Sequence, residues 1–533
     1  MSSSIRAATP SDAFSWLELA KTSIGADYPS PQVYKPEWFA TEADAASGNE
    51  TWVSETGGVL DGTISILGSG AGASPIANLG RQFFRPASYA NGSAILLLKA
   101  VLSVCSARNQ MIVVRVPAAD NLQQILFENA GFVCSGFQPF KHMLQTRVSA
   151  LFYVYAAEHQ LVTRLQISES LIQISELACV VLERLNISTP LKVRDGVTGY
   201  PLQSDLKFHD GTFEEYEIWR TQAEASNPPL EISGSFNQGA GMMRLGGGSG
   251  FRILLGQRNN VMVAGVAYIL DEVDRCVRVV QSFTSDDLST GTLLQQLLKI
   301  SQEQLNAVFV EIDILATAPR LLKSAEQLGF VPVAYLPGFY RKADGGADVV
   351  KMVKLNLPYS LDGVDLTAHA KVIATIVDNN FKDQKLGVAI INLLRTLPIF
   401  EGLGDGELRK IARLFTQKLY RPGERIFRKG DSGEEAFIVM RGQVDIQLEE
   451  EGKPIANVPS GKIFGELAFL DGAPRNAFAI ANQASILLVL QRAALNDLVQ
   501  REPHLGMVVM RNIAMDLSMK LRQANNTLAQ LRK

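Results

Sequence analysis

One acidic and one basic side chain flank a glycine turn in the C-terminal part of the sequence. The acidic residue is Glu466, which follows Gly465, and the basic residue is Arg475, which follows a proline. A planar guanidinium can bind a phosphate through two parallel hydrogen bonds, and an ionised carboxylate can accept a hydrogen bond from a sugar hydroxyl. Backbone amides at a helical turn after Gly465 would add donors for the phosphate. The pair therefore predicts a site for a cyclic nucleotide, and the plain alternative is a surface turn followed by an unrelated Pro-Arg.

Short strands separated by turns surround this pair. Turns are predicted at 421–424 and 429–431, and an apolar strand is predicted at 436–440. The residues at 444–448 alternate between apolar and polar, which is typical of a half-buried strand. Another apolar strand at 486–490 closes the run. This pattern predicts a roll of short strands that positions the two charged side chains.

Residues from about Leu397 to Leu521 resemble the cyclic-nucleotide-binding domain of catabolite activator proteins and protein kinase regulatory subunits. The turns and the binding motif occur in the order that is typical of this family. The resemblance implies that cAMP or cGMP is the regulatory ligand, that Glu466 holds its ribose hydroxyl and that Arg475 holds its cyclic phosphate. Further contacts are implied for Gly465, Leu467, Ala468, Asn476 and Ala477. Asn476 stands where the family often has Ala or Thr, so the choice between cAMP and cGMP stays open.

The composition limits the classes of protein that fit. The chain has 533 residues, of which 47% are hydrophobic and 20% are charged, and its net charge is −3. This length predicts several domains, and the charge balance argues against a nucleic-acid partner. The four cysteines and five histidines are dispersed, which argues against disulfides and metal sites. Residues 1–6 lack the apolar core expected of a signal peptide, and the sequence has no apolar run of the ~20 residues that cross a bilayer. We therefore expect a cytoplasmic protein without a membrane span.

The first 150 residues show strands, a helix that starts at a glycine, a further strand, a second helix and a Gly-Phe ending. The glycine is Gly92, and Ser93 and Ala94 follow it. This order resembles the GNAT superfamily of acetyl-CoA-dependent N-acetyltransferases, and the resemblance implies that Gly92, Ser93 and Ala94 bind the diphosphate of CoA. Phe127 stands where the family often has the tyrosine that protonates the leaving thiolate. A phenyl ring cannot donate a proton, so this role would need another group.

Residues 191–357 repeat the same predicted layout, including the Gly-Phe ending. We interpret this as an internal duplication of the acyltransferase-like fold. The diphosphate loop of this second copy keeps Gly291 and Thr292. It also carries Asp286 where the family has Gln or Arg, and an acid there would repel a diphosphate. The tyrosine position is taken by Ala325, so cofactor binding by this copy is in doubt.

Two carboxylates of the second copy are the candidate acid–base residues. Glu311 and Asp313 alternate with apolar residues, so both project from one face of a predicted strand. If that face opens on a substrate cleft, one of them could accept the proton of an amine, with its pKa raised by burial and by its like-charged neighbour. The alternative is a strand with one hydrated face, or carboxylates that pair with nearby Arg or Lys.

Helical segments are expected between and after these units. Residues 168–185 have an amphipathic period, and two helices are predicted at 367–377 and 385–394. The latter two could transmit nucleotide binding or act as a passive tether. The glycine-rich run at 243–250 lacks the Gly-Lys-Ser/Thr ending of a phosphate loop and predicts a hairpin or a flexible lid. The last predicted helix, 507–531, could pair two copies into a homodimer or fold back on its own roll. Its apolar residues at heptad-like spacing include Ile513, Leu517, Leu521 and Leu528.

Together these patterns predict an α+β multidomain protein. The expected parts are an acyltransferase-like mixed α/β domain at 1–150, a helical connector at 151–190, a second acyltransferase-like domain at 191–357, a helical linker at 358–396, and a jelly-roll-like cyclic-nucleotide-binding domain with flanking helices at 397–533. One function that fits is an acetyl-CoA-dependent N-acyltransferase, acting on a protein or a small amine, that the cyclic nucleotide regulates. The other is a non-catalytic, cyclic-nucleotide-responsive adaptor with degenerate acyltransferase-fold domains.

Overall fold

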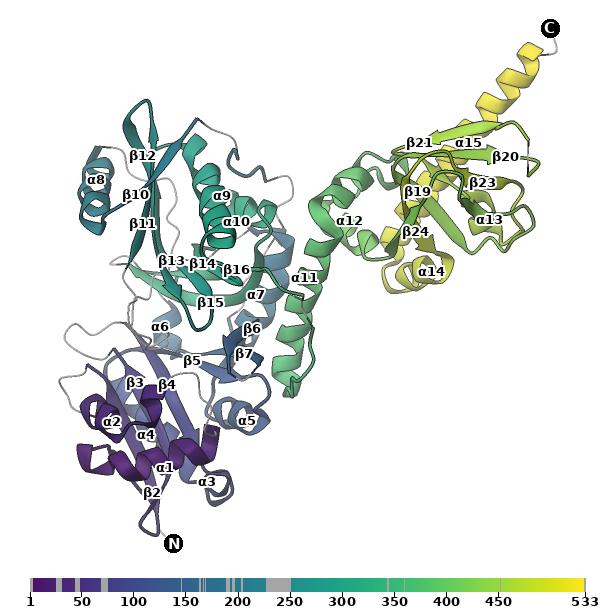
Figure 1. Ribbon diagram of the computed structural model, residues 1–533. Helices are drawn as coiled ribbons and strands as arrows, with labels where there is room; N and C mark the ends of the chain where they lie inside the picture. Colours follow the sequence, from purple (N-terminus) through teal and green to yellow (C-terminus); the bar gives the residue numbers. More distant parts are fainter. Residues whose placement is uncertain are drawn as a thin grey trace. The chain divides into compact units, whose positions relative to one another are not determined.

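The computed structural model divides the chain into two compact units, unit 1 (Met1–Asn380) and unit 2 (Phe381–Lys533). Figure 1 shows the strands and helices of both units. The structure describes residues 3–24, 31–43, 48–68, 75–144, 146–162, 164–165, 167, 169–187, 192–193, 197–202, 205–226, 251–342, 345–358, 360–450 and 452–531. The predicted hairpin at 243–250 lies outside these residues. None of the helices within the described ranges is long and apolar enough to cross a membrane.

Unit 1 is built on one sheet of 14 strands, and its first half has the strand order β1-β2-β3-β4-β5-β7-β6. The strands of this half are β1 (Ser3–Ala7), β2 (Glu50–Thr56), β3 (Val59–Leu67), β4 (Ile76–Phe84), β5 (Met111–Pro117), β6 (Val133–Met143) and β7 (Arg147–Tyr155). Its helices are α1 (Ala13–Ile24), α2 (Pro36–Glu42), α3 (Pro86–Asn91), α4 (Ser93–Ala107) and α5 (Asn121–Asn129). The apolar faces of α1 and α2 pack on β2–β4, where Trp16, Phe39 and Val53 form a buried core.

The second half of the sheet has the same strand order when it is followed inward from the opposite edge, β10-β11-β12-β13-β14-β16-β15. Its strands are β10 (Lys207–Gly211), β11 (Arg252–Arg258), β12 (Val261–Asp271), β13 (Cys276–Thr284), β14 (Phe309–Leu315), β15 (Val331–Lys342) and β16 (Gly345–Leu355). Its helices are α8 (Phe213–Ser226), α9 (Asp287–Glu303) and α10 (Pro319–Gln327). The two halves join where β6 and β15 pair, with Gly136 opposite Ala334.

Each half contains one pair of parallel strands, and each pair is short. In the first half β4 and β5 pair only from Ile76 to Leu79 of β4. In the second half β13 and β14 pair only from Cys276 to Arg278 of β13. Beyond these residues β4 and β5 are no longer paired with each other, and neither are β13 and β14. The two halves thus have the same strand order, and in both the parallel strands separate after a few residues. Both features agree with the internal duplication that the sequence predicts.

The segment between the halves agrees with the sequence in part. It contains α6 (Glu158–Val162), β8 (Glu169–Ser170), α7 (Ile172–Arg184) and β9 (Lys192–Val193). The predicted amphipathic helix is α7, and Ile174, Leu177 and Val181 on its apolar face are buried. The expected boundary at residue 150 falls inside β7, because the buried apolar residues of this strand continue to Val154.

The linker holds one continuous helix, α11 (Ala368–Arg395), in place of the two predicted helices. The residues between the two predicted helices, 378–384, are mostly polar. Asp378 and Asn380 are nevertheless buried, and the Asn380 side-chain amide donates to the carbonyl of Gln173 (3.3 Å). Because polar residues with partners can continue a helix and no proline interrupts this one, the break does not occur.

Unit 2 is the predicted roll of short strands with flanking helices. One sheet has the order β17-β24-β19-β22 and the other has the order β18-β23-β20-β21. The strands are β17 (Phe415–Tyr420), β18 (Arg425–Phe427), β19 (Glu435–Arg441), β20 (Gln443–Gln447), β21 (Ala456–Pro459), β22 (Ile463–Phe464), β23 (Phe478–Ala481) and β24 (Ser485–Gln491). The helices are α12 (Asp405–Ala412), α13 (Glu466–Asp471), α14 (Arg492–Arg501) and α15 (Pro503–Leu531). Phe437, Val439 and Val489 belong to the core between the two sheets.

The last helix packs on its own unit over its first half. Leu505, Val509 and Ile513 of α15 are buried in the core that the helices share with the roll, and Leu517 packs against that core. This is the folded-back arrangement that the sequence left open. The side chains of Leu521 and Leu528 lie outside the described part of the chain, and pairing of two copies through α15 stays a prediction.

Candidate functional site

The backbone of Arg475 is fixed to the predicted turn at 429–431. Its amide donates a hydrogen bond to the carbonyl of Asp431 (2.9 Å), and its carbonyl accepts one from the amide of Gly430 (2.8 Å). Two segments that are more than 40 residues apart in the chain are joined in this way. The turn therefore sets where the Arg475 side chain enters the roll.

The guanidinium of Arg475 lies inside the roll, and the residue is 4% exposed. Its Nη1 donates to the carbonyl of Gly465 (2.8 Å), and its Nη2 donates to the carbonyl of Glu435 (2.6 Å). The group also lies over the ring of Phe427, with 4.4 Å between its Cζ atom and the ring centroid. Within the described residues its Nε is buried and has no hydrogen-bond partner. One donor of this buried cation is thus unused by the protein.

Gly465 is a close neighbour of this guanidinium. It has a φ of 73°, in the left-handed region that favours glycine, and it precedes α13. A Cβ atom at this position would lie only 2.8 Å from Nη1 of Arg475. Only glycine therefore permits both the turn and the close contact with the arginine.

The other predicted residues of this site follow the same turn. Glu466 is the first residue of α13 and is half-buried, Leu467 is 53% exposed, and Ala468 is buried. Asn476 is exposed and Ala477 is half-buried, next to Arg475. The structure thus brings Gly465 and Arg475 into direct contact, and it places Glu466 next to that contact in the chain.

The electrostatics of the site favour an anion. Burial lowers the pKa of Arg475, and the charges of Glu435 and Asp431 oppose this shift. An arginine nevertheless remains protonated at neutral pH, so a buried positive charge with a free donor faces the α13 turn. A phosphate can accept a hydrogen bond from such a donor, and these residues therefore fit the predicted ligand.

Sequence reasoning missed three contributors to the site. Phe427 and Phe437 lie under the guanidinium, with the Cζ of Arg475 4.4 and 5.6 Å from their ring centroids, and Glu435 supplies a carbonyl to it. Phe437 lies in the predicted strand 436–440, and Phe427 lies between the two predicted turns. Alternation along a strand shows which residues share a face but does not show which side chain from another strand meets that face.

The predicted diphosphate site of the first half is arranged differently from an open phosphate loop. The helix α3 occupies the expected loop and ends at Gly92, and α4 begins at Ser93. The Ser93 amide donates to the side-chain oxygen of Asn91 (2.8 Å), and the Ser93 hydroxyl donates to the buried carboxylate of Asp61 (2.7 Å). Burial raises the pKa of Asp61, but hydrogen bonds from Ser54 and Ser93 outweigh burial and lower it. A buried anion of the protein itself therefore lies at the start of this helix.

The second half shows the same feature more directly. Asp286 is the N-cap of α9, and its carboxylate accepts hydrogen bonds from the amide (2.8 Å) and the hydroxyl (2.7 Å) of Ser289. A Cβ atom at Gly291 would lie 2.2 Å from the carbonyl oxygen of Pro201, so another segment of the chain covers this glycine. The residues at α4 and α9 do not fit a bound diphosphate, because a carboxylate of the protein already accepts hydrogen bonds from the serine at each helix start.

The cap of α9 gives a testable prediction. Replacing Asp286 with alanine should lower the free energy of unfolding by about 1–2 kcal/mol, because the N-cap hydrogen bond to Ser289 is lost. Asparagine at the same position is the matched control, because its side chain caps a helix about as well and, like alanine, it lacks the ion pair of Asp286 with Arg258 (2.6 Å). Urea denaturation of the three proteins would check this. An alanine variant as stable as the parent protein would show that the cap contributes nothing.

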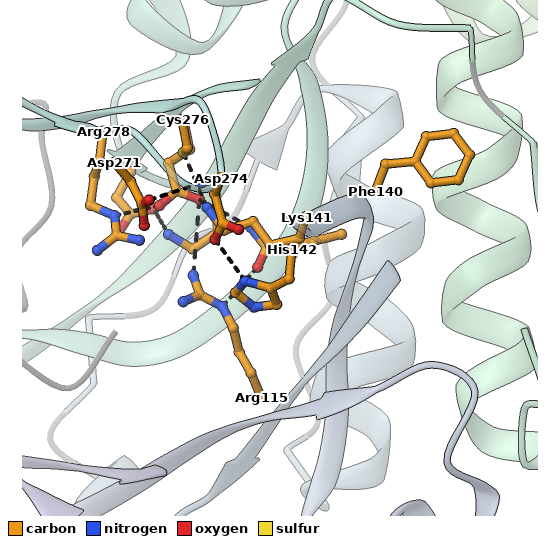
Figure 2. A network of polar contacts seen from close by, with 12 residues as sticks. Arg115, Phe140, Lys141, His142, Asp271, Asp274, Cys276 and Arg278 are labelled. Carbon is orange, nitrogen blue, oxygen red and sulfur yellow. Dashed lines mark hydrogen bonds and ion pairs between the residues drawn. The ribbon is translucent and has the colours of Figure 1, made fainter. Parts of the chain in front are cut away.

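The candidate acid–base residue Glu311 lies in a buried network of polar contacts, which Figure 2 shows. Its carboxylate accepts a hydrogen bond from Nζ of Lys141 (3.0 Å) and one from Nε of Arg278. Burial raises the pKa of Glu311, but the charges of Lys141 and Arg278 outweigh burial and lower the pKa well below its usual value. The expectation of a raised pKa is therefore wrong, and the alternative of pairing with Arg or Lys is confirmed.

Asp313 has a similar arrangement two residues later in β14. Its carboxylate pairs with Nζ of Lys351, and the side chains of both residues are at least 95% buried. This ion pair joins β14 to β16, the strand that pairs with it in the sheet. The contacts of Glu311 and Asp313 thus support a role in holding the sheet together over a role as general base.

His142 at the edge of the same network gives a prediction for pH. Its Nδ1 lies 2.8 Å from a carboxylate oxygen of Asp274. Burial nevertheless lowers the pKa of His142 to about 4. Since the pKa of an unfolded histidine is about 6.5, the unfolded chain binds a proton that the folded chain does not bind as the pH falls from 6.5 towards 4. We expect unit 1 to lose about 2–3 kcal/mol of stability over this range.

The measurement for this prediction is urea denaturation between pH 7 and 4.5. His142→Asn should reduce the loss of stability with falling pH, because asparagine does not titrate in this range. His209→Asn is the control, since His209 is an exposed histidine of β10. Equal dependence on pH in the parent protein and in His142→Asn would contradict the prediction.

Comparison with known proteins gives matches in unit 2. Residues 417–502 match the family described as cyclic nucleotide-binding domain. The cyclic AMP receptor protein of Thermus thermophilus is 33% identical over 131 residues, which are 24% of this chain and 59% of that protein. The cGMP-dependent protein kinase egl-4 of Caenorhabditis briggsae is 34% identical over 125 residues, which are 22% of this chain and 17% of that protein. The chain thus spans less than two thirds of the length of these relatives.

A solved structure matches the same region. The catabolite activator protein of Thermus thermophilus has 33% sequence identity, a TM-score of 0.23, and coverage of 25% of this chain and 62% of that chain. The family match falls on the two four-stranded sheets and includes both Gly465 and Arg475. Residues 417–502 therefore belong to the cyclic nucleotide-binding domain family.

Proposed function

We propose that unit 2 binds cAMP or cGMP and that this binding is the sensing function of the chain. Arg475 would hold the cyclic phosphate, and Glu466 would hold the ribose hydroxyl. The observation that carries the proposal is the buried guanidinium of Arg475 against Gly465, with its Nε free of partners in the described residues. The match to the cyclic nucleotide-binding domain family supports the same ligand class. Both cAMP and cGMP appear in the names of the relatives, so the preferred purine stays open.

Calorimetric titration of the full chain with cAMP and with cGMP tests this proposal. We expect saturable binding of at least one of them with one site per chain. Adenosine 5′-monophosphate is the control ligand, because it has the same base and a free phosphate but lacks the cyclic diester. The proposal would be contradicted if neither cAMP nor cGMP gave a heat of binding.

For unit 1 we propose a duplicated acyltransferase-like fold that has lost its cofactor site and acts as a cyclic-nucleotide-responsive adaptor. The repeated strand order supports the duplicated fold. The carboxylates of Asp61 and Asp286 at the starts of α4 and α9 favour the adaptor over an acetyl-CoA-dependent N-acyltransferase. Phe127 and Ala325 stand at the predicted tyrosine positions, and neither side chain has a group that can donate a proton.

Equilibrium binding of acetyl-CoA to the full chain separates the two functions. The adaptor predicts no saturable binding in the presence or absence of cAMP. Saturable binding that Gly92→Glu abolishes, together with acetylation of a protein or a small amine, would instead establish the acyltransferase. Gly58→Glu is the matched control, since Gly58 also has a positive φ and open space around it but lies in the β2–β3 turn.

A further inference from the structure

The buried network between the two halves of unit 1 contains more positive than negative charge. Its cations are Arg115, Lys141, Arg278 and Lys351, and its carboxylates are Glu311 and Asp313. Asp274 adds a third carboxylate at the edge, where it pairs with His142. Asp271, which accepts a hydrogen bond from the amide of Asp274, is a fourth carboxylate, and Arg147, which donates to the carbonyl of Asp274, is a fifth cation. One positive charge is therefore left over. Because an unbalanced buried charge is costly, such a cluster is a natural place for an anion from outside the protein.

The network has a buried floor and a partly open rim. The side chains of Glu311 and Lys141 are each 1% exposed and form the floor. The side chains of Arg115 and Arg278 are 11% and 15% exposed and form the rim. In Figure 2 the side chains of Arg115, Lys141 and Arg278 come together from different strands, whereas that of Phe140 points away from them. Arg115 and Arg278 are therefore less deeply buried than Lys141 and Glu311.

The two rim arginines share a single carboxylate. Arg278 of β13 donates to Glu311 through its Nε, and Nη2 of Arg115 of β5 lies 3.9 Å from the other oxygen of Glu311. Arg115 and Arg278 belong to opposite halves of the sheet. The single negative charge of Glu311, in the second half, thus faces the positive charges of Arg115 from the first half and Arg278 from the second.

The rim arginines also have unused donors. Arg115 donates through Nε to the side-chain oxygen of Gln138 (2.9 Å), but its Nη2 is buried and makes no hydrogen bond to the residues that the structure describes. Arg278 uses only its Nε for hydrogen bonds to that part of the chain. Burial lowers the pKa of Arg115 to about 10, the charge of Glu311 opposes this shift, and the charge of Arg278 adds to it. The two guanidiniums are therefore close enough to repel each other, and an anion between them would relieve that repulsion.

The parallel pairing of the strands ends at the two arginines. Arg278 and Glu311 are the last residues through which β13 and β14 pair, and these strands continue without pairing with each other. Arg115 directly follows Val114, which is the last residue of β5 to pair with β4. Both arginines thus lie where a pair of parallel strands separates. A ligand that enters here breaks no hydrogen bond between the strands of either pair.

We propose that Arg115 and Arg278 bind the carboxylate or phosphate group of a small anionic ligand at the junction of the two halves of unit 1. A guanidinium presents parallel N–H donors that match either group. The free donors of Arg115 and Arg278 would contact the ligand, and Lys141 and Glu311 would stay paired beneath it. A ligand held in this way contacts both halves and stabilises their pairing.

Calorimetry with sodium phosphate and with sodium succinate at low ionic strength tests this site. The full chain should carry Arg475→Ala, so that unit 2 contributes no phosphate binding and the result is independent of the cyclic-nucleotide proposal. We expect one site per chain for at least one anion, and the tighter ligand identifies the preferred group. Arg115→Gln and Arg278→Gln should each weaken binding at least about tenfold. Arg252→Gln, which removes an exposed arginine of β11, should leave binding unchanged.

A second pair of measurements guards against misfolding. Arg115→Lys keeps the charge but loses the planar fork, so it should fold as the parent protein does and still bind the anion more weakly. The midpoint of thermal unfolding of the parent protein should rise with anion concentration, and Arg115→Lys should reduce that rise. The proposal is overturned if neither anion binds, or if folded Arg115→Gln and Arg278→Gln bind as tightly as Arg252→Gln.

Discussion

Replacing Glu311 with glutamine is expected to lower the free energy of unfolding of unit 1 by about 3–5 kcal/mol. Glu311 is 1% exposed and accepts hydrogen bonds from Lys141 and Arg278. Glutamine has nearly the same shape, but it removes the negative charge and leaves buried cations without their main partner. The large effect comes from these unpaired cations, because the net contribution of an intact buried ion pair is small. Urea denaturation at pH 7 measures the change.

The effect of pH on this variant separates charge from packing. The pKa of Glu311 is lowered in the folded protein, so its charge stabilises the fold fully above the unfolded value of about 4.3. This contribution is lost as the pH falls through the lower folded pKa. The difference between the parent protein and Glu311→Gln should therefore shrink below pH 4. Glu303→Gln, at an exposed position of α9, is the control and should change stability little. A difference that stays constant down to pH 3 would point to packing instead.

The sequence predicted the fold best where the signals are local. In unit 2, glycine turns and alternating strands are close together in the chain, and the roll is found as expected. In α11, by contrast, the predicted break between two helices does not occur, because Asn380 finds a partner at Gln173. The partner lies about 200 residues away in the chain, and a local pattern cannot show it.

The candidate sites show the same limit. Strand alternation correctly put Glu311 and Asp313 on one face, but the opposing Lys141 comes from the other half of the sheet. Because Lys141 forms an ion pair with Glu311, the residue predicted as a general base is a partner in a buried ion pair. For Arg475, the motif predicted its closeness to Gly465, ten positions earlier. It could not predict Phe427 beneath the guanidinium, because that contact depends on how the two sheets of the roll pack.

Replacing Arg475 with alanine is expected to weaken cyclic-nucleotide binding by about 1.5–3 kcal/mol, which is about a 10- to 150-fold rise in Kd. The guanidinium is the buried cation next to Gly465, and alanine would leave the phosphate without a charged partner. The carbonyls of Gly465 and Glu435 would also lose their donor, so thermal unfolding must confirm that unit 2 remains folded.

Two further variants show whether nucleotide binding depends on the parallel N–H donors of Arg475 or only on its charge. Lysine at this position keeps the charge but cannot present parallel donors, so Arg475→Lys should bind the nucleotide more weakly than the parent protein and more tightly than Arg475→Ala. Arg441→Ala removes an exposed arginine of β19 in the same unit and should not change the Kd. If the parent protein binds cAMP or cGMP and Arg475→Ala binds it equally well, the phosphate must be held elsewhere. The buried guanidinium would then serve only to join Gly465 to Glu435, because those two carbonyls already account for both of its Nη groups.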